Sequence, residues 1–414
     1  MTDPEVTRDS IADLIAQLDR AVSVGNRDDA ALLEQRILKR LAAEFSHLQD
    51  VERQVRSLME ALVEPLPVQK SEFSLTGHLR APASADKPVV YPVWFCTNRE
   101  AKVSGGGFTG DRCTSVTYGR VDVRVPLAHR RGETGSSFWT HLRRLDFRDD
   151  DLRIETLVNQ KPLECFEEIR RKIQNARDDH GIPHALIYLH GYRVSFEEAA
   201  IRAAQLGCDL EVAGVTAFFS WPSRDRVDAY SADEASIEAS EAAITEFLVA
   251  FSANCQADKI HLVAHSMGNR GLLRALQRIA GNAETKGKVK FGQIFLAAPD
   301  VDRDLFLDLA RLYSEHSDRT TLYASHGDLA VDISAKVHDA ARAGYFMPYT
   351  AAAGIDTIAV PNFNIDLFGH SYYAEAKAML DDMQVLMQKN LEPCMERNME
   401  PANSNGVDFW RLRG

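Results

Sequence analysis

The segment with the clearest chemical meaning runs from Lys259 to Asn269 and reads KIHLVAHSMGN. An apolar run leads directly into Ser266, and small residues, Ala264 and Gly268, stand two positions before and after it. This pattern is typical of a nucleophile elbow, a tight strand-to-helix turn that exposes a serine hydroxyl. The following helix directs its N-terminal dipole at the serine, which favours negative charge on a reacting oxygen. We predict Ser266 as the nucleophile, although Ala264 replaces the usual glycine; a buried serine beginning an ordinary helix is the alternative.

A second turn could supply the donors that bind a developing oxyanion. Tyr188 to Arg193 reads YLHGYR and ends an earlier apolar run. A His-Gly turn at this place can present a backbone N–H to a substrate carbonyl, and Gly191 allows the backbone to approach closely. We expect the oxyanion to be bound by the N–H groups of Tyr192 and Met267. His190 is expected to brace this turn rather than to act as the base.

The base and its acid should follow the nucleophile in the order serine, acid, histidine. His370, in Phe-Gly-His-Ser-Tyr, follows the last expected strand and is predicted as the base. Asp328 follows another expected strand and is predicted as the acid that orients the imidazole. Asp300 remains the alternative acid. His326 and His338 suit the role of the base less well, because one precedes the acid and the other falls in an expected helix.

Substrate contacts are expected from His190, Gly191, His265 and Trp221. Trp221 follows an expected strand, so it either lines the pocket or packs in the core. The apolar run at 345–349 lies in a long connection and is expected either to form a lid or to pack on the core. Triad chemistry requires neither a metal nor a cofactor, and we expect none.

The elements that must position these residues alternate along the chain. Apolar strands are expected at 185–189, 215–220, 259–264, 291–298, 320–325 and 355–360. Helical patterns are expected at 196–206, 232–251, 270–279, 304–313 and 372–387. This alternation predicts an α/β fold with a mostly parallel central sheet and helices on both faces. Catalytic groups in such folds lie at the carboxyl ends of the strands. Residues 89–95 and 115–125 are expected as two antiparallel strands at a sheet edge.

The chain divides into four expected regions. Residues 1–72 form an N-terminal helical region, 73–87 a linker, 88–390 the catalytic domain and 391–414 a C-terminal tail. Within the first region, apolar residues recur every three or four positions. This pattern predicts a helical hairpin folded on the catalytic domain, or a coiled coil through which two copies form a homodimer.

The composition and net charge of the chain argue against several classes of protein. The chain has 414 residues, and its formal net charge of −12 disfavours nucleic acid, which needs a basic surface. The six cysteines show neither metal-site nor disulfide spacing. Since the N-terminus lacks a signal-peptide pattern and no apolar run is long enough to span a bilayer, we expect a cytoplasmic protein without an integral membrane segment.

Taken together, residues 88–385 resemble the α/β-hydrolase superfamily, and within it the uncharacterised bacterial family of unknown function numbered 900. The resemblance rests on the motifs PVWFCTNR at 92–99, YGRV at 118–121, LHGY at 189–192, SWPS at 220–223, AHSMGN at 264–269, AAPD at 297–300 and SHGD at 325–328. It implies a serine hydrolase with a Ser-Asp-His triad. It implies no defined natural substrate and says nothing about the N-terminal region.

The expected function is therefore hydrolysis of carboxylic esters, of esterase or lipase type, through an acyl-enzyme on Ser266. The substrate would be a small-molecule or lipid ester. A thioesterase, phospholipase, acyltransferase or peptidase could use the same triad. From another class, a non-catalytic interaction protein built on the coiled coil is the alternative.

Overall fold

The chain divides into two compact units, Met1–Ser84 and Ala85–Gly414. The computed structural model describes Gln17, Leu33 and residues 89–103, 105–125, 152–180, 182–226, 229–325, 340–344, 349–360, 373–393, 395–404 and 406–412. The expected N-terminal helices, the linker, Asp328 and His370 lie outside these residues. So do His326, His338 and residues 345–348 of the apolar run.

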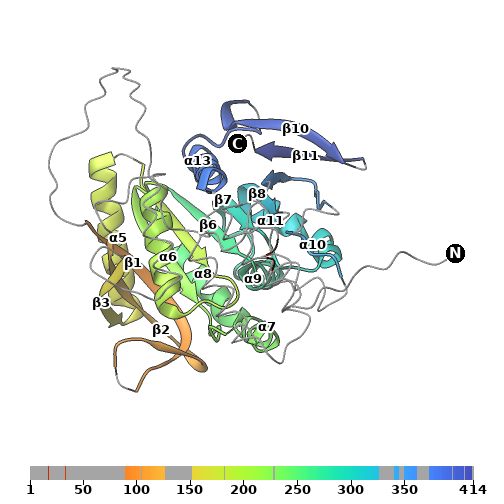
Figure 1. Cartoon of the computed structure of the whole chain (residues 1–414). Coiled ribbons are helices and arrows are strands. Elements are labelled where there is room, and N and C mark those ends of the chain that lie inside the picture. The colour runs from red at the N-terminus through yellow and green to blue at the C-terminus, as the bar shows by residue number, and fades with distance from the viewer. Residues whose placement is uncertain are drawn as a thin grey trace. The chain divides into compact units, whose positions relative to one another are not determined.

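One 11-stranded sheet organises the described part of the second unit (Figure 1). Its strands are β1 (Val89–Ala101), β2 (Phe108–Val125), β3 (Arg153–Gln160), β4 (His184–Leu189), β5 (Gly214–Ser220), β6 (Lys259–His265), β7 (Phe291–Ala297), β8 (Ser317–Ser325), β9 (Ile355–Val360), β10 (Met399–Ser404) and β11 (Val407–Leu412). Their order is β10-β11-β9-β8-β7-β6-β4-β5-β1-β2-β3. In this spatial order, every pair of neighbours between β11 and β1 is parallel. The outer pairs β1–β2, β2–β3 and β10–β11 are antiparallel.

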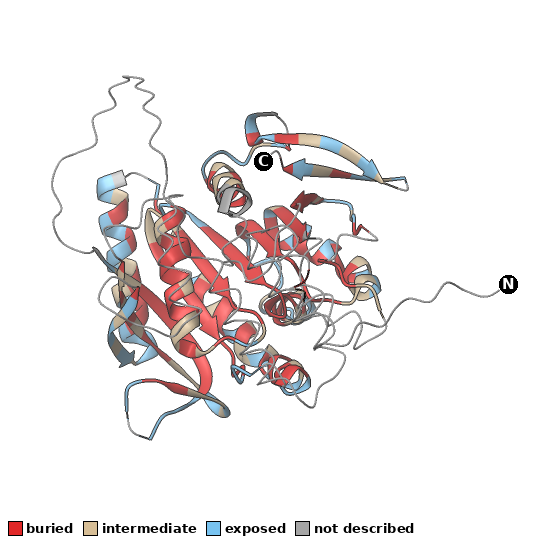
Figure 2. Ribbon diagram, viewed as in Figure 1, coloured by how far each residue is buried: buried red, intermediate tan, exposed pale blue. Residues whose placement is uncertain are grey.

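Helices cover both faces of the sheet. They are α5 (Pro162–His180), α6 (Phe196–Asp209), α7 (Tyr230–Ala239), α8 (Glu241–Asn254), α9 (Gly268–Gly281), α10 (Arg303–Leu309), α11 (Arg311–His316) and α13 (Tyr373–Lys389), with a short 3-10 helix η2 (Met395–Arg397). Two large apolar clusters fill the two interfaces: α5, α7 to α9, α10 and α11 pack on one face, and α6 and α13 on the other. The central strands are therefore buried on both sides (Figure 2) and read as continuous apolar runs in the sequence.

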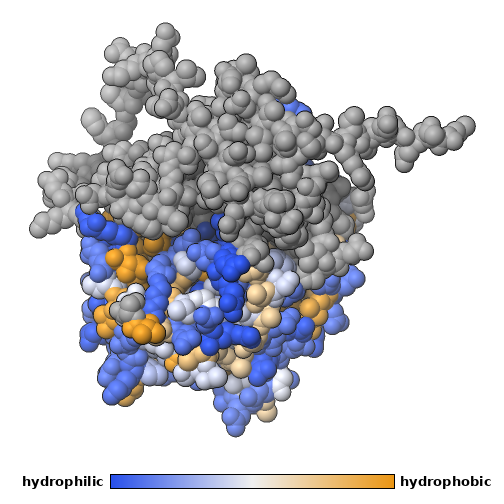
Figure 3. Space-filling model, turned by 60° about the horizontal axis from the view of Figure 1, so that its bottom comes forward, coloured by the Kyte–Doolittle hydropathy of each residue, from blue (hydrophilic) through white to orange (hydrophobic). Residues whose placement is uncertain are grey.

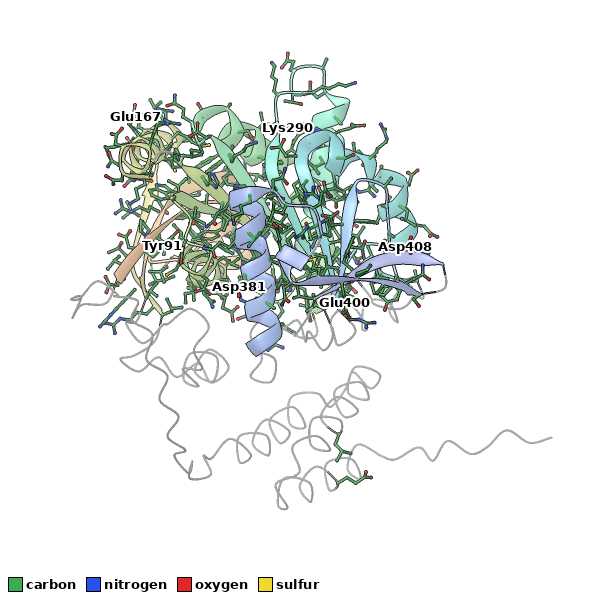
Figure 4. All side chains as sticks on the ribbon, turned by 90° about the horizontal axis from the view of Figure 1, so that it is seen from above. Tyr91, Glu167, Lys290, Asp381, Glu400 and Asp408 are labelled. Atoms are coloured by element: carbon green, nitrogen blue, oxygen red, sulfur yellow. The ribbon has the colours of Figure 1, made fainter. Side chains whose placement is uncertain are left out.

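The expected α/β fold is thus confirmed, with differences at the sheet edges. The segment 391–414, expected as a tail, contributes β10 and β11, and Trp410 of β11 pairs with Ile358 of β9. At the other end, β1 and β2 pair as expected, but β1 also pairs with β5 and the outermost strand is β3. Seen from above in Figure 4, Tyr91 and Glu167 lie at one end of the sheet, and Glu400 and Asp408 at the other.

The helix expected at 232–251 is broken into α7 and α8 at Ser240. The hydroxyl of Ser240 donates to the carbonyl of Ser236 at 2.7 Å and accepts from Asn98 Nδ2 at 2.9 Å. A hydroxyl that bonds back to its own helix often bends it. The helix expected at 304–313 is likewise two short helices, α10 and α11.

The topology changes direction at β4. From β4 the chain places β5 on one side, and then β6 on the other. In open α/β sheets, ligands bind beyond the carboxyl ends of the strands at such a switch point. The turns that follow β4 and β6 are the two that carry His190–Tyr192 and Ser266.

On the part of the surface that Figure 3 shows in colour, the described residues are mostly hydrophilic, with small hydrophobic patches between them. Within the described ranges, no helix is both long and apolar enough to span a membrane. The same residues contain no cluster of three or more His, Cys, Asp or Glu side chains that could hold a metal ion.

Candidate active site

Ser266 stands in a strained turn between β6 and α9. Its φ is +47°, in the left-handed region that non-glycine residues rarely adopt. Hydrogen bonds hold the turn: the Ser266 N–H donates to Ala297 O at 2.9 Å, and Asn269 Nδ2 donates to both Ala264 O and Ser266 O at 3.0 Å. Because strain of this kind persists only where the surroundings enforce it, it points to a functional turn.

The turn after β4 lies directly beside this elbow. Leu189 of β4 pairs with Ala264 of β6, which brings the two strand ends level. A Cβ added to Gly191 would lie 2.8 Å from His265 Nδ1 and 2.9 Å from Ser266 Cβ. Only glycine therefore fits at position 191, and the His-Gly turn is in contact with the serine.

α9 begins equally close to β4. A Cβ on Gly268 would lie 2.5 Å from His190 O and 2.8 Å from Leu189 O. Met267, the N-cap of α9, is fully buried, and no hydrogen bond from its N–H to another described residue is found. The first backbone donor after Ser266 is thus held at the strand ends, and none of the described residues accepts from it.

His190 is fully buried and has a partner on each ring nitrogen. Nδ1 lies 2.9 Å from Gly191 O, and Nε2 lies 3.3 Å from Ser220 Oγ and 3.5 Å from Arg99 Nη2. Burial, and then the charge of Arg99, lower the pKa of His190 well below its usual range, so the ring is neutral. The neutral, buried imidazole thus links the His-Gly turn to Ser220 and Arg99.

Trp221 belongs to the same assembly. It is fully buried in the core, its ring stacks on His190 with centroids 4.9 Å apart, and its Nε1 donates to His190 O at 2.8 Å. Of the two positions expected for this residue, pocket wall and core, the structure shows packing in the core. Its hydrogen bond makes it a second brace of the His-Gly turn.

Arg99, at the end of β1, was not predicted as a site residue. Its guanidinium is buried and donates to four uncharged oxygens: Ser220 Oγ at 2.8 Å and the carbonyls of Thr109 at 3.2 Å, Ser223 at 2.9 Å and Val194 at 2.7 Å. Burial lowers the pKa of Arg99 to about 10, still far above neutrality. One buried cation therefore joins β2 to the segments that follow β4 and β5. In the sequence analysis Arg99 appears only as the last residue of the motif PVWFCTNR at 92–99.

Asp233 of α7 also contacts the segments that follow β4 and β5. Its buried carboxylate accepts from Ser223 Oγ at 2.5 Å and from the backbone N–H groups of Arg224 and Arg193 at 2.8 and 3.2 Å. Arg193, directly after the predicted oxyanion donor Tyr192, has a φ of +55°. Burial nevertheless raises the pKa of Asp233 above its usual value.

His265 precedes the serine and is also buried. Neither of its ring nitrogens has a hydrogen-bond partner among the residues that the structure describes. Burial, assisted by Arg202, lowers its pKa to about 3, so it is neutral at physiological pH. The ring of His265 lies against Gly191, so His265 is in contact with the His-Gly turn.

Asp300, the alternative acid, lies close to the elbow, because its N–H donates to Ser266 O at 3.2 Å. Its buried carboxylate accepts from the Tyr230 hydroxyl at 2.6 Å and forms ion pairs with Arg270 at 3.4 Å and Arg342 at 3.5 Å. The carboxylate of Asp300 therefore links the segment after β7 to α7 through a hydrogen bond and to α9 through an ion pair.

β8 precedes the predicted acid and β9 precedes the predicted base, and the carboxyl ends of these two strands lie next to each other. Ser325, the last residue of β8, pairs with Val360, the last residue of β9. Asp328 and His370 follow these ends in the sequence, and both lie outside the described residues. Their expected roles therefore stay predictions.

The switch-point topology and the serine elbow together define the α/β-hydrolase class. The model of a family described as α/β hydrolases of unknown function (DUF900) matches residues 164–389, more than half of the chain, and the protein belongs to this family. The resemblance predicted from the motifs is thereby confirmed. No curated protein matches the chain.

Solved structures of hydrolases are also similar in part. A candidate hydrolase from Agrobacterium vitis S4 is 13% identical with a TM-score of 0.31, over 72% of this chain and 98% of that chain. The thermophilic esterase Est2 from Thermogutta terrifontis is 15% identical with a TM-score of 0.28, over 51% and 84%. A fungal esterase from Rhizomucor miehei is 12% identical with a TM-score of 0.31, over 73% and 83%. At these TM-scores, none of them carries a functional argument.

Proposed function

We propose that this protein is a serine hydrolase that cleaves carboxylic esters through an acyl-enzyme on Ser266. The observation that carries the proposal is the strained turn at Ser266, with φ +47°, in contact with the His-Gly turn at the topological switch point. A serine held in this way beside backbone donors suits nucleophilic attack on a carbonyl carbon.

In the proposed reaction, His370 removes the proton of Ser266 Oγ as the oxygen attacks the ester carbonyl. The N–H groups of Met267 and Tyr192 bind the oxyanion. His370 then gives the proton to the departing alcohol, which leaves the acyl group on the serine. Water, deprotonated by the same histidine, releases the carboxylic acid and restores the serine.

We propose Asp328 rather than Asp300 as the acid that orients His370. The carboxylate of Asp300 is already paired with Arg270 and Arg342, and these cations stabilise its charge without an imidazole. Asp328 follows β8, whose end lies beside that of β9, the strand that precedes His370. Because these two strands end beside each other, contact between the segments that follow them, which carry Asp328 and His370, is favoured.

A panel of p-nitrophenyl esters that differ in acyl length tests the proposal on wild type and Ser266→Ala. Turnover should be lost in the variant, and a fluorophosphonate probe should label Ser266 in the wild type, as located by peptide mass spectrometry. Ser317→Ala is the matched control: this buried serine is the first residue of β8, at the amino-terminal end of the strand and not at the carboxyl ends that carry the elbow, and its loss should leave turnover unchanged. Full turnover by Ser266→Ala would refute the proposal.

A further inference from the structure

The Gly191–Tyr192 peptide carries the proposed oxyanion donor, so its orientation decides whether the donor faces the nucleophile. In a trans peptide the C=O and the N–H point in opposite directions. Any contact that holds the carbonyl of Gly191 therefore also sets the direction of the Tyr192 N–H. His190 Nδ1, 2.9 Å from that carbonyl oxygen, makes such a contact.

This contact is attractive only in one tautomer of His190. A carbonyl oxygen can only accept, so Nδ1 must carry the proton, and in a neutral ring Nε2 must then be an acceptor. The opposite tautomer would place two lone pairs against each other at 2.9 Å. The tautomer of a histidine is set by what its other nitrogen meets.

The other nitrogen meets a chain of donors that begins at Arg99. A guanidinium has no acceptor, and Arg99 Nε donates to Ser220 Oγ at 2.8 Å. The hydroxyl hydrogen of Ser220 is then free to point at His190 Nε2, 3.3 Å away. Arg99 Nη2 faces the same nitrogen at 3.5 Å. Both groups thus require Nε2 to accept.

We propose that Arg99 is a positioning residue for the oxyanion site: through Ser220 it holds His190 in the Nδ1–H tautomer, which orients the Gly191–Tyr192 peptide. The inference rests on the proposed function. Arg99 touches no reacting atom. Its bonds to the carbonyls of Val194 and Ser223 hold the ends of the two loops, and its charge keeps the chain of hydrogen bonds polarised in one direction.

Steady-state kinetics on a p-nitrophenyl ester test this role with Arg99→Met, Ser220→Ala and the double variant. Arg99→Met should lower kcat roughly ten- to a hundred-fold with little change in KM, because a misdirected oxyanion donor affects mainly the transition state. Ser220→Ala should act in the same direction. The double variant should be no worse than Arg99→Met alone, since both residues act through His190.

Arg120→Met is the matched control, because this half-buried arginine of β2 forms ion pairs with Asp122 and Glu168 away from the elbow. Its kcat should equal that of the wild type. A raised KM at unchanged kcat in Arg99→Met, or multiplicative losses in the double variant, would overturn the inference.

Two further outcomes separate this inference from the proposed function. An active wild type with an unchanged kcat in Arg99→Met overturns the positioning role alone. A wild type that neither turns over esters nor reacts with a fluorophosphonate overturns the proposed function, and the inference with it. If Arg99→Met does not fold, Ser220→Ala decides, and an unchanged kcat in that variant overturns the inference.

Discussion

Replacing Gly268 by alanine should force apart the two turns that form the proposed oxyanion site. The added Cβ would lie 2.5 Å from His190 O and 2.8 Å from Leu189 O. Both are backbone atoms, so no side chain can rotate away. Since real Cβ contacts essentially never fall below 3.0 Å, α9 and the end of β4 must separate by at least about 0.5 Å.

The size of the effect follows from this displacement. Overpacking of a buried site costs about 1–3 kcal/mol of unfolding free energy, which corresponds to a fall in Tm of roughly 2–6 °C. A misplacement of about 1 Å can cost about 10²-fold in rate, so half of that displacement should lower kcat roughly ten-fold. The loss should fall on kcat, because the two N–H donors act mainly in the transition state.

Gly281→Ala provides the control on the same helix. Apart from its chain neighbours and its own helix backbone, no described residue lies within 4 Å of a Cβ at Gly281, the last residue of α9, so alanine should be neutral or stabilise by up to ~1 kcal/mol through its helix propensity. Thermal unfolding and ester turnover are measured for both variants. If Gly268→Ala is as stable and as active as Gly281→Ala, the close approach of α9 to β4 is refuted.

Two further predictions concern parts of the fold outside the elbow. Arg397→Met should lower the unfolding free energy by about 3–5 kcal/mol, because it leaves the carboxylate of Asp382 without its cation. The side chains of Arg397 and Asp382 are only 0% and 1% exposed, so water cannot replace the lost partner. Urea unfolding measures the change, and a loss below about 1 kcal/mol would contradict the prediction. Burial lowers the pKa of His261 in the folded protein to about 3, whereas the unfolded chain binds the proton near its usual pKa of about 6.5. Unfolding free energy should therefore fall as pH drops from about 6.5 towards 3, and His261→Gln should show a shallower fall; equal slopes would show that His261 does not contribute.

The elbow could be predicted because its signal is local. The apolar run, Ser266 and the two small neighbours Ala264 and Gly268 lie within 11 consecutive residues. The His-Gly turn is local in the same way, since a short apolar strand ends directly at His190. Contact between the two turns then follows from the parallel pairing of β4 with β6.

The role of Arg99 could not be predicted, because its partners are far apart in the sequence. Its oxygens come from Thr109, Val194, Ser220 and Ser223, which lie 10 to 124 residues away. Nothing in the neighbourhood of position 99 distinguishes a buried arginine from a solvated one. Such a residue can be recognised only once the loops that surround it have been placed.

The sheet edges were missed for a different reason. No residue of β3 is buried, only Met399 of β10 is, and β10 contains Pro401. A proline disfavours a central strand but is tolerated at an edge. Polar, exposed edge strands therefore resemble loops in the sequence, and the C-terminal hairpin was predicted as a tail.

The pairing of β1 with β5 has a consequence for how the protein folds. Thr97 on β1 donates to Ser220 at the end of β5, 123 residues further along the chain. Contacts of such high sequence separation are slow to form, because a long loop must close before they give any stabilisation. Arg99 and Ser220 meet only when this pairing is complete. Hydrolytic competence should therefore be gained late in refolding, after β4 and β6 have paired, and partly folded chains should carry the serine in an inactive form.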